Sequence, residues 1–182
     1  MGEVPDLGRL LADLILDVPD FPEAGVVFKD ISPLLADHDG FTQVVEHLAA
    51  AGRDDAGAVA VDKVIGIEAR GFILAAPVAL ALGAGFVPVR KAGKLPRATF
   101  QQSYDLEYGT ATLEMHEDAL QSGERVLVVD DVLATGGTIE ATVALAERTG
   151  AHVAAVSVLI ELGFLSGRDK LASLPVRSLL KT

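Results

Sequence analysis

The chain has 182 residues, no cysteine and a formal net charge of -11 at pH 7. Its length suits one domain that buries roughly 70% of its unfolded surface, and the absence of cysteine excludes disulfides, thiolate zinc sites and a cysteine nucleophile. A surface this acidic argues against general nucleic-acid binding. Any anionic ligand must therefore be held by a local pocket.

The N-terminal segment predicts a helix followed by a short strand. Apolar residues at helical spacing form one face that suits docking, and they are Leu7, Leu10, Leu11, Leu14 and Ile15. Pro19 and Pro22 end this helix, and a short strand follows between Gly25 and Pro33. The first residues are acidic where a signal peptide would be basic, so we expect no targeting signal and a cytoplasmic protein.

The segment Gly71–Val89 contains no charged residue and is long enough to raise the question of a membrane span. Gly83, Gly85 and Pro88 would interrupt a continuous helix there. The pattern instead predicts a buried helix, a glycine turn and a strand over Phe86–Arg90.

A helix is predicted around Phe41–Leu48, ending at Gly52, and a strand over Lys63–Ile67. The strand runs directly into Glu68-Ala69-Arg70 and another helix. Backbone N–H groups in such a turn face the carboxyl edge of a sheet, and Arg70 adds a planar bidentate donor. By spacing alone this is a weak anion-site signal, since ordinary structural turns look the same.

A basic cluster, Arg90–Arg97, interrupts the acidic chain and contains Gly93 and Pro96. Runs of charge usually belong to solvated loops. Here the local sign is opposite to that of the whole chain. A flexible basic loop would therefore also suit a lid that closes over pyrophosphate and excludes water.

Two antiparallel strands are predicted next, over Gln102–Tyr108 and Thr110–His116, joined at Gly109. The second strand alternates, with Ala111, Leu113 and Met115 on one face and Thr112, Glu114 and His116 on the other. Glu107 lies in the first strand, and from the residues alone it is best interpreted as a surface glutamate.

The stretch Val126–Thr138 predicts the main binding site. Four apolar β-forming residues make a strand buried on both faces, and the adjacent Asp130 and Asp131 follow at its carboxyl edge, where they suit the vicinal hydroxyls of a ribose. Beyond them, Ala134–Thr138 can form a nest of N–H groups at a helix N-terminus, with added hydroxyl donors, which is a cradle for one phosphate. An ordinary strand, turn and capped helix is the structural alternative.

The remaining pattern completes an α/β chain, with a helix over Ile139–Arg148, a buried strand over Val153–Ile160 and a last strand near Leu179. Alternating strands and helices predict a doubly wound, mostly parallel central sheet with flanking helices. The four histidines are scattered, so we expect no metal held by protein ligands alone. Hydrolase, nucleotide triphosphatase and dehydrogenase glycine motifs are absent from the sequence.

Over roughly residues 21–170 the chain resembles the type I phosphoribosyltransferases, with at least four motifs in the expected order. The resemblance implies that Asp130 and Asp131 hold the ribose of 5-phosphoribosyl-1-pyrophosphate (PRPP). It implies 5′-phosphate contacts, which serve AMP as well, from Ala134, Thr135, Gly136, Gly137 and Thr138. It also implies a catalytic Arg70, and pyrophosphate contacts from Glu68, Ala69, Arg70, Arg90, Lys91 and Lys94.

Two further segments resemble the adenine-specific branch of this family. Residues 21–33 are similar to its N-terminal hood, where Phe28 would stack on adenine and the Val27 and Lys29 backbones would read its edge; relatives commonly carry arginine at the Lys29 position. Residues 103–109 resemble the segment whose glutamate, here Glu107, is assigned as acid/base. The implied reaction converts adenine and PRPP to AMP and pyrophosphate, with Mg²⁺ held mainly by PRPP and water.

The resemblance further implies one domain over residues 1–182, with the helix and hood over about 1–35, a flexible catalytic loop over about 90–102, and a homodimer. We expect no nucleic-acid or membrane partner. Two alternatives stay open: a phosphoribosyltransferase for another purine base, and a PRPP-sensing regulator without turnover.

Overall fold

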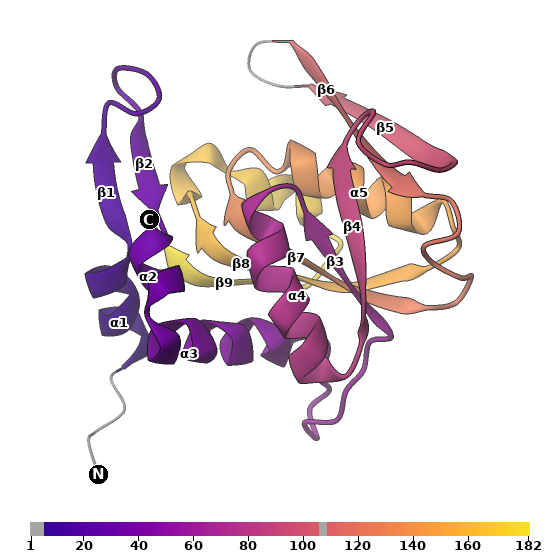
Figure 1. Ribbon diagram of the computed structural model, residues 1–182, viewed down its shortest axis with the longest axis horizontal. Coiled ribbons are helices and arrows are strands. Elements are labelled where there is room, and N and C mark those ends of the chain that lie inside the picture. Colours follow the sequence, from indigo (N-terminus) through magenta and orange to yellow (C-terminus); the bar gives the residue numbers. More distant parts are fainter. Residues whose placement is uncertain (1–5, 106–108) are drawn as a thin grey trace. The chain divides into compact units, whose positions relative to one another are not determined.

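The computed structural model describes residues 6–105 and 109–182 (Figure 1). The chain packs as two compact units, an N-terminal unit that ends at Val45 and a larger unit over Glu46–Thr182. Each unit is built from local patterns that the sequence carries.

The N-terminal unit contains helices and a two-stranded hairpin. Its elements are α1 (Leu7–Leu14), β1 (Leu16–Pro19), β2 (Val27–Asp30), α2 (Ser32–Ala36) and the first part of α3 (His38–Ala49). The predicted first helix and short strand are both present, whereas the antiparallel pairing of β2 with β1 was not predicted. The hairpin turn contains Asp20 and Gly25 at positive φ and a cis bond between Phe21 and Pro22.

The larger unit contains a seven-stranded sheet in the order β5-β6-β4-β3-β7-β8-β9. The strands are β3 (Lys63–Ile67), β4 (Gly85–Lys91), β5 (Thr99–Asp105), β6 (Thr110–His116), β7 (Arg125–Leu133), β8 (His152–Glu161) and β9 (Val176–Lys181). Strands β4, β3, β7, β8 and β9 are parallel, and β5 and β6 add an antiparallel edge beside β4. The predicted doubly wound, mostly parallel sheet is confirmed.

Helices cover both faces of this sheet, with α4 (Arg70–Leu82) packing on β3, β4 and β7 and α5 (Gly137–Glu147) on β5 to β8 (Figure 1). Short 3₁₀ segments complete the unit: η1 (Ala50–Gly52), η2 (Gly163–Leu165) and η3 (Gly167–Leu171). The middle of the sheet forms the core, where Val126–Val129 have no exposed surface.

The uncharged stretch Gly71–Val89 divides as predicted, into α4, a turn and β4. In the described part of the chain, no helix has the length and apolar character to cross a membrane.

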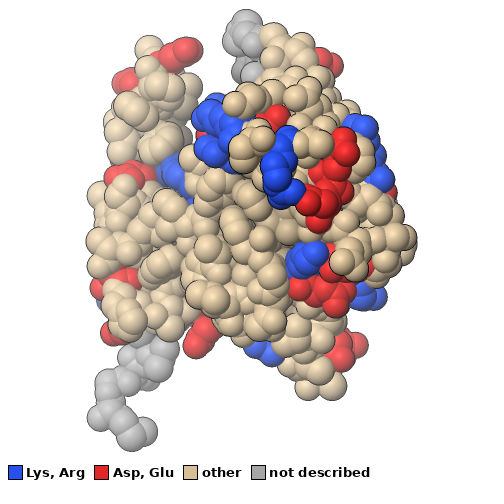
Figure 2. All heavy atoms as spheres, turned by 45° about the vertical axis from the view of Figure 1, so that its right-hand side comes forward, with Lys and Arg blue, Asp and Glu red and all other residues tan. Residues whose placement is uncertain are grey.

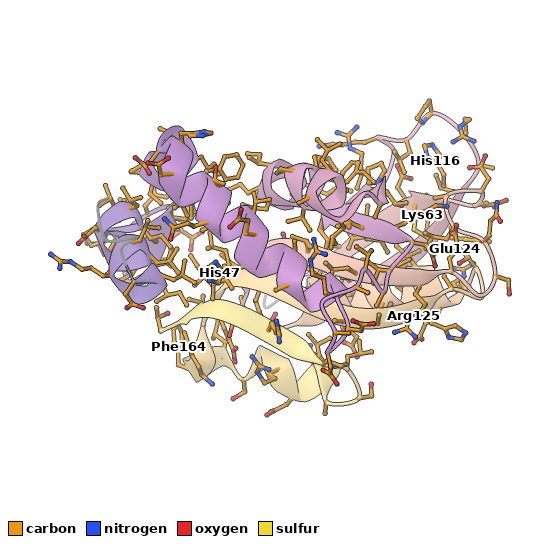
Figure 3. The ribbon with its side chains drawn as sticks, turned by 90° about the horizontal axis from the view of Figure 1, so that it is seen from below. His47, Lys63, His116, Glu124, Arg125 and Phe164 are labelled. Atoms are coloured by element: carbon orange, nitrogen blue, oxygen red, sulfur yellow. The ribbon has the colours of Figure 1, made fainter. Side chains whose placement is uncertain are left out.

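The amino ends of the parallel strands carry a structural ion pair. Lys63, the first residue of β3, lies beside Glu124, which precedes β7 (Figure 3). The Lys63 Nζ and Glu124 Oε2 atoms are 2.9 Å apart, and Lys63 also donates to the Ala119 carbonyl at 2.9 Å. The pair joins neighbouring strands at the edge opposite the strands' carboxyl ends.

Glu161, the last residue of β8, ties the C-terminal segments together and is only 3% exposed. Its carboxylate accepts hydrogen bonds from Arg168 Nε at 3.0 Å and Ser178 Oγ at 2.7 Å, and Lys181 Nζ lies 3.4 Å away. The Arg168 hydrogen bonds outweigh burial and lower the pKa of Glu161 to about 2. The Arg168 guanidinium also holds η3 against β9 through the Val176 carbonyl, at 2.7 Å.

We predict that Glu161→Gln destabilises the protein by up to about 3 kcal/mol at neutral pH. Because the folded-state pKa lies below the ordinary value of 4.5, this stabilisation is complete above about pH 4.5 and is lost as the pH falls toward 2. Urea unfolding of both proteins from pH 7 to pH 2.5 measures it, with Glu147→Gln, at an exposed helix position, as the control. A stability difference that stays constant across this range would contradict the prediction.

Candidate functional site

The acidic pair lies buried at the carboxyl end of β7. Asp130 and Asp131 are 7% and 8% exposed, and the Asp131 amide donates to Asp130 Oδ1 at 2.9 Å. A buried strand delivers both side chains to the edge where parallel strands end. Their burial excludes the interpretation of the pair as exposed aspartates on a solvated turn.

The turn after β3 lies next to this pair because β3 and β7 are neighbours in the sheet. A cis peptide joins Glu68 to Ala69, and α4 begins at Arg70. Arg70 Nη2 lies 2.6 Å from Asp131 Oδ2. Gly71 fits against Asp130, since a Cβ built on it would lie 2.6 Å from Asp130 Oδ1. The structure therefore brings the two predicted strand-to-helix turns into one site.

The electrostatics of the pair follow from burial and from this arrangement. Burial, followed by the neighbouring charge of Asp131, raises the pKa of Asp130 well above its ordinary value. Arg70 counters only part of that effect. The Arg70 guanidinium balances one carboxylate of the pair, and carboxylate oxygens can accept hydrogen bonds from hydroxyl groups.

The predicted phosphate cradle, Ala134–Thr138, connects β7 to α5. Gly136 adopts φ +82, and a Cβ built there would lie 2.4 Å from the Gly167 carbonyl oxygen. Both the conformation and the space therefore require glycine at this position. Since Gly167 precedes Arg168, the pairing of Arg168 with the buried Glu161 also fixes the segment that packs on the cradle. The first N–H groups of α5 have no intrahelical acceptor and can meet an anion.

The two threonines of the cradle differ in their surroundings. Thr135 is exposed, whereas Thr138 is partly buried and its Oγ1 donates to the Tyr104 hydroxyl at 3.2 Å. Tyr104 comes from β5, and a Cβ built on Gly137 would lie 3.1 Å from its ring. Sequence reasoning missed Tyr104, because nothing in the local pattern of β5 shows that this strand crosses α5.

The basic cluster Arg90–Arg97 is paired with acidic side chains. Glu68 accepts hydrogen bonds from Arg90 Nε at 3.2 Å and from the Lys91 amide at 3.1 Å, and it pairs with Lys94 Nζ. Figure 2 shows basic side chains in the upper part of the molecule with acidic atoms among them. Burial acts to raise the pKa of Glu68, but the hydrogen bonds from Lys94, Lys91 and Arg90 outweigh it and leave the pKa lowered. The carboxylate thus gathers the predicted pyrophosphate residues beside the Glu68–Arg70 turn.

The predicted adenine-binding residues lie in the β1–β2 hairpin of the N-terminal unit. Val27 is 51% exposed, and the Phe28 and Phe21 rings meet edge to face with centroids 5.2 Å apart. Lys29 Nζ lies 2.6 Å from Asp17 Oδ1, across the hairpin. The hairpin thus presents aromatic and apolar side chains suited to a planar base.

Two further predictions concern the acid/base residue and the metal. Glu107, the predicted acid/base, lies outside the described residues. Within residues 6–105 and 109–182, no three histidine, aspartate or glutamate side chains gather as a metal-binding group. Asp130 and Asp131, just before the cradle in the chain, are carboxylates of the kind that hard cations bind.

Comparison with known proteins places this site in a family. The model of the phosphoribosyl transferase domain matches residues 34–174. An adenine phosphoribosyltransferase from Nocardioides sp. is 65% identical over 178 residues, which cover 98% of this chain and 96% of the relative.

Solved structures agree with the sequence comparison. The adenine phosphoribosyltransferase of Thermoanaerobacter pseudethanolicus is 47% identical with a TM-score of 0.90, over 97% of this chain and 100% of that one. The Saccharomyces cerevisiae enzyme, solved with adenine and an imino-altritol bisphosphate, is 38% identical with a TM-score of 0.87, over 95% and 98% of the chains. The chain therefore belongs to the phosphoribosyl transferase domain family, among its adenine phosphoribosyltransferases.

Proposed function

We propose that this protein transfers the 5-phosphoribosyl group of PRPP to adenine, giving AMP and pyrophosphate. The observation that carries the proposal is the buried pair Asp130–Asp131, which lies between the Arg70 turn on one side and the glycine cradle on the other. One edge of the sheet thus carries three kinds of group. Acids there suit sugar hydroxyls, amides suit a phosphate, and cations suit a pyrophosphate. That combination matches the functional groups of PRPP.

The sugar and its 5′-phosphate account for one half of the site. The ribose hydroxyls donate to Asp130 and Asp131, and the amides of 134–138 with the Thr135 and Thr138 hydroxyls hold the phosphate. Each hydrogen bond to a charged group is worth about 1.5–3 kcal/mol, against about 0.3–1 for the helix dipole. The amides and hydroxyls therefore dominate phosphate binding.

The pyrophosphate occupies the other half of the site, at the Glu68–Ala69–Arg70 turn. Its arrival offers Arg70 a stronger anionic partner than Asp131, offers Arg90 and Lys94 an alternative to Glu68, and offers the Lys91 ammonium an anion. The ion pairs with Asp131 and Glu68 hold these cations near the positions that pyrophosphate needs. On binding, the Asp131 carboxylate turns to the ribose.

The chemistry exchanges one bond at the anomeric carbon for another. The bond from that carbon to pyrophosphate oxygen breaks with oxocarbenium character, the adenine nitrogen attacks from the opposite face, and adenine loses a proton. By resemblance to the family, Glu107 is the base that accepts this proton. Correct orientation supplies up to about 7–11 kcal/mol, whereas one acid/base group gives a factor of about 10²–10⁴. Positioning is the main contribution of the residues described above.

The remaining assignments rest on the family. Val27, Phe28 and Lys29 are the proposed adenine-binding segment. The carboxylates of Asp130 and Asp131 suit a hard cation, and Mg²⁺ would chelate chiefly to PRPP oxygens and water, where it offsets the charge of the leaving group. We propose a homodimer in a reducing cytoplasm, with which a chain free of cysteine agrees.

The substrate assignment predicts AMP formation from adenine, PRPP and Mg²⁺, with hypoxanthine and guanine at least about 10²-fold slower, because a base-reading site rejects analogues that leave its polar groups unpaired. Chromatography of the nucleotide products measures it. Preference for hypoxanthine or guanine would establish a transferase for another base. PRPP binding without any nucleotide product would establish a sensor.

We predict that Asp130→Ala combined with Asp131→Ala lowers kcat/KM by at least about 10⁴-fold, because sugar orientation is lost. Glu107→Gln should cost less, within about 10²–10⁴-fold. Steady-state kinetics test the ranking, with Asp54→Ala plus Asp55→Ala as a matched adjacent pair at exposed positions. The reverse ranking would refute it.

Gly136→Ala should raise the KM for PRPP by about 10²-fold, because its Cβ would displace the Gly167 carbonyl and open the cradle. Gly123→Ala is the control, since Gly123 has a similar φ of +88 but nothing within 4 Å of an added Cβ. Both variants bear the cost of a positive φ, about 1–2 kcal/mol. Equal KM values for the two variants would show that the cradle does not hold the phosphate.

A further inference from the structure

Glu114 is a buried carboxylate that the proposed reaction does not use. It lies on β6, the middle strand of the antiparallel edge, opposite Arg90 on β4 and Gln101 on β5. Its exposed fraction is only 2%. A charge so deeply buried is costly unless hydrogen bonds compensate it, so its partners indicate its role.

The partners of Glu114 are chiefly backbone amides of the basic cluster. Its Oε1 accepts the N–H groups of Lys94 and Leu95, each at 2.8 Å, while Oε2 lies 3.4 Å from donors on Thr99 and Gln101. Gly93 adopts φ +84, which lets successive amides converge on one anion. Burial acts to raise the pKa of Glu114, but the amides of Leu95, Gly93 and Lys94 outweigh it and keep the pKa low.

We call the Glu114 carboxylate, with the Lys94 and Leu95 amides that donate to it, the anchor. Together with two other contacts, the anchor fixes Lys94 at three points. The Lys94 amide is held by Glu114, its carbonyl accepts from Arg90 Nη1 at 3.2 Å, and its ammonium pairs with Glu68. Glu68 begins the turn that leads to Arg70. The Lys94 ammonium is thereby set beside the proposed pyrophosphate site of its own chain.

We propose that Glu114 is a positioning residue for pyrophosphate: it holds the backbone of Gly93–Leu95 so that Lys94 meets the leaving group of PRPP. The inference rests on the proposed function for its kinetic consequence, but the anchor itself does not. Charge-assisted hydrogen bonds are about twice as strong as neutral ones, so Gln in place of Glu114 would weaken the anchor and turn an N–H₂ group or a neutral oxygen toward the amides.

Amide hydrogen exchange tests the anchor without any catalysis. In the wild-type protein the Lys94 and Leu95 amides should exchange at least about tenfold more slowly than freely exposed amides, and Glu114→Gln should abolish that protection. Glu117→Gln, the same change at an exposed position three residues later, should leave it intact. Unprotected Lys94 and Leu95 amides in the wild type would overturn the proposal even if the variant failed to fold.

Kinetics test the positioning role. Glu114→Gln should raise the KM for PRPP, and for pyrophosphate in the reverse direction, by about 10- to 100-fold while the KM for adenine stays unchanged. In a Lys94→Ala background the same substitution should add less than about twofold, because Glu114 acts through Lys94. Full additivity of the two effects, or an equal rise in the KM for adenine, would show a merely structural role.

The outcomes separate the two hypotheses. If wild type and Glu117→Gln make no AMP, the proposed function fails, while the exchange result still decides whether the anchor exists. If both make AMP and Glu114→Gln has wild-type KM values for PRPP and pyrophosphate, the positioning proposal fails and the proposed function stands.

Discussion

The parallel pairing of β3 with β7 is the constraint on which the site depends. It places two strand-to-helix turns side by side, so that Arg70 from one turn reaches Asp131 from the other at 2.6 Å. Neither turn alone recognises more than a simple anion. Together they offer acids, amides and a guanidinium at one edge of the sheet, where ligands of open α/β folds bind.

The cations of the site are balanced by acids of the same chain. Asp131 pairs with Arg70, and Glu68 pairs with Arg90 and Lys94, so three of the cations proposed for pyrophosphate have an acid beside them. The acids of these pairs are buried, with the side chains of Asp131 and Glu68 only 11% and 9% exposed, so a cation can leave its acid only where that acid keeps or gains another hydrogen-bond partner. The chain can thus bind a highly charged substrate while its own net charge is -11.

Local patterns in the sequence predicted the sheet strands and the helix that follows each binding turn, because burial and glycine placement act over neighbouring residues. The Lys63–Ile67 strand and the division of the uncharged stretch are examples. Tyr104, Gly167 and Glu114 were not predicted as parts of the site, since their roles arise from contacts between segments distant in the sequence. The Glu68–Ala69 cis peptide likewise has no sequence signal. The roles of Val27, Phe28, Lys29 and Glu107 stay predictions from family resemblance.

The central claim is that a phosphoribosyl group binds where β7 ends, with acids on its hydroxyls and amides on its phosphate. A crystal structure of the protein with AMP tests it most directly. The account predicts the 5′-phosphate within hydrogen-bond distance of the 134–138 amides and the ribose hydroxyls against Asp130 and Asp131. An AMP phosphate bound at another location, with the cradle occupied only by solvent, would contradict it.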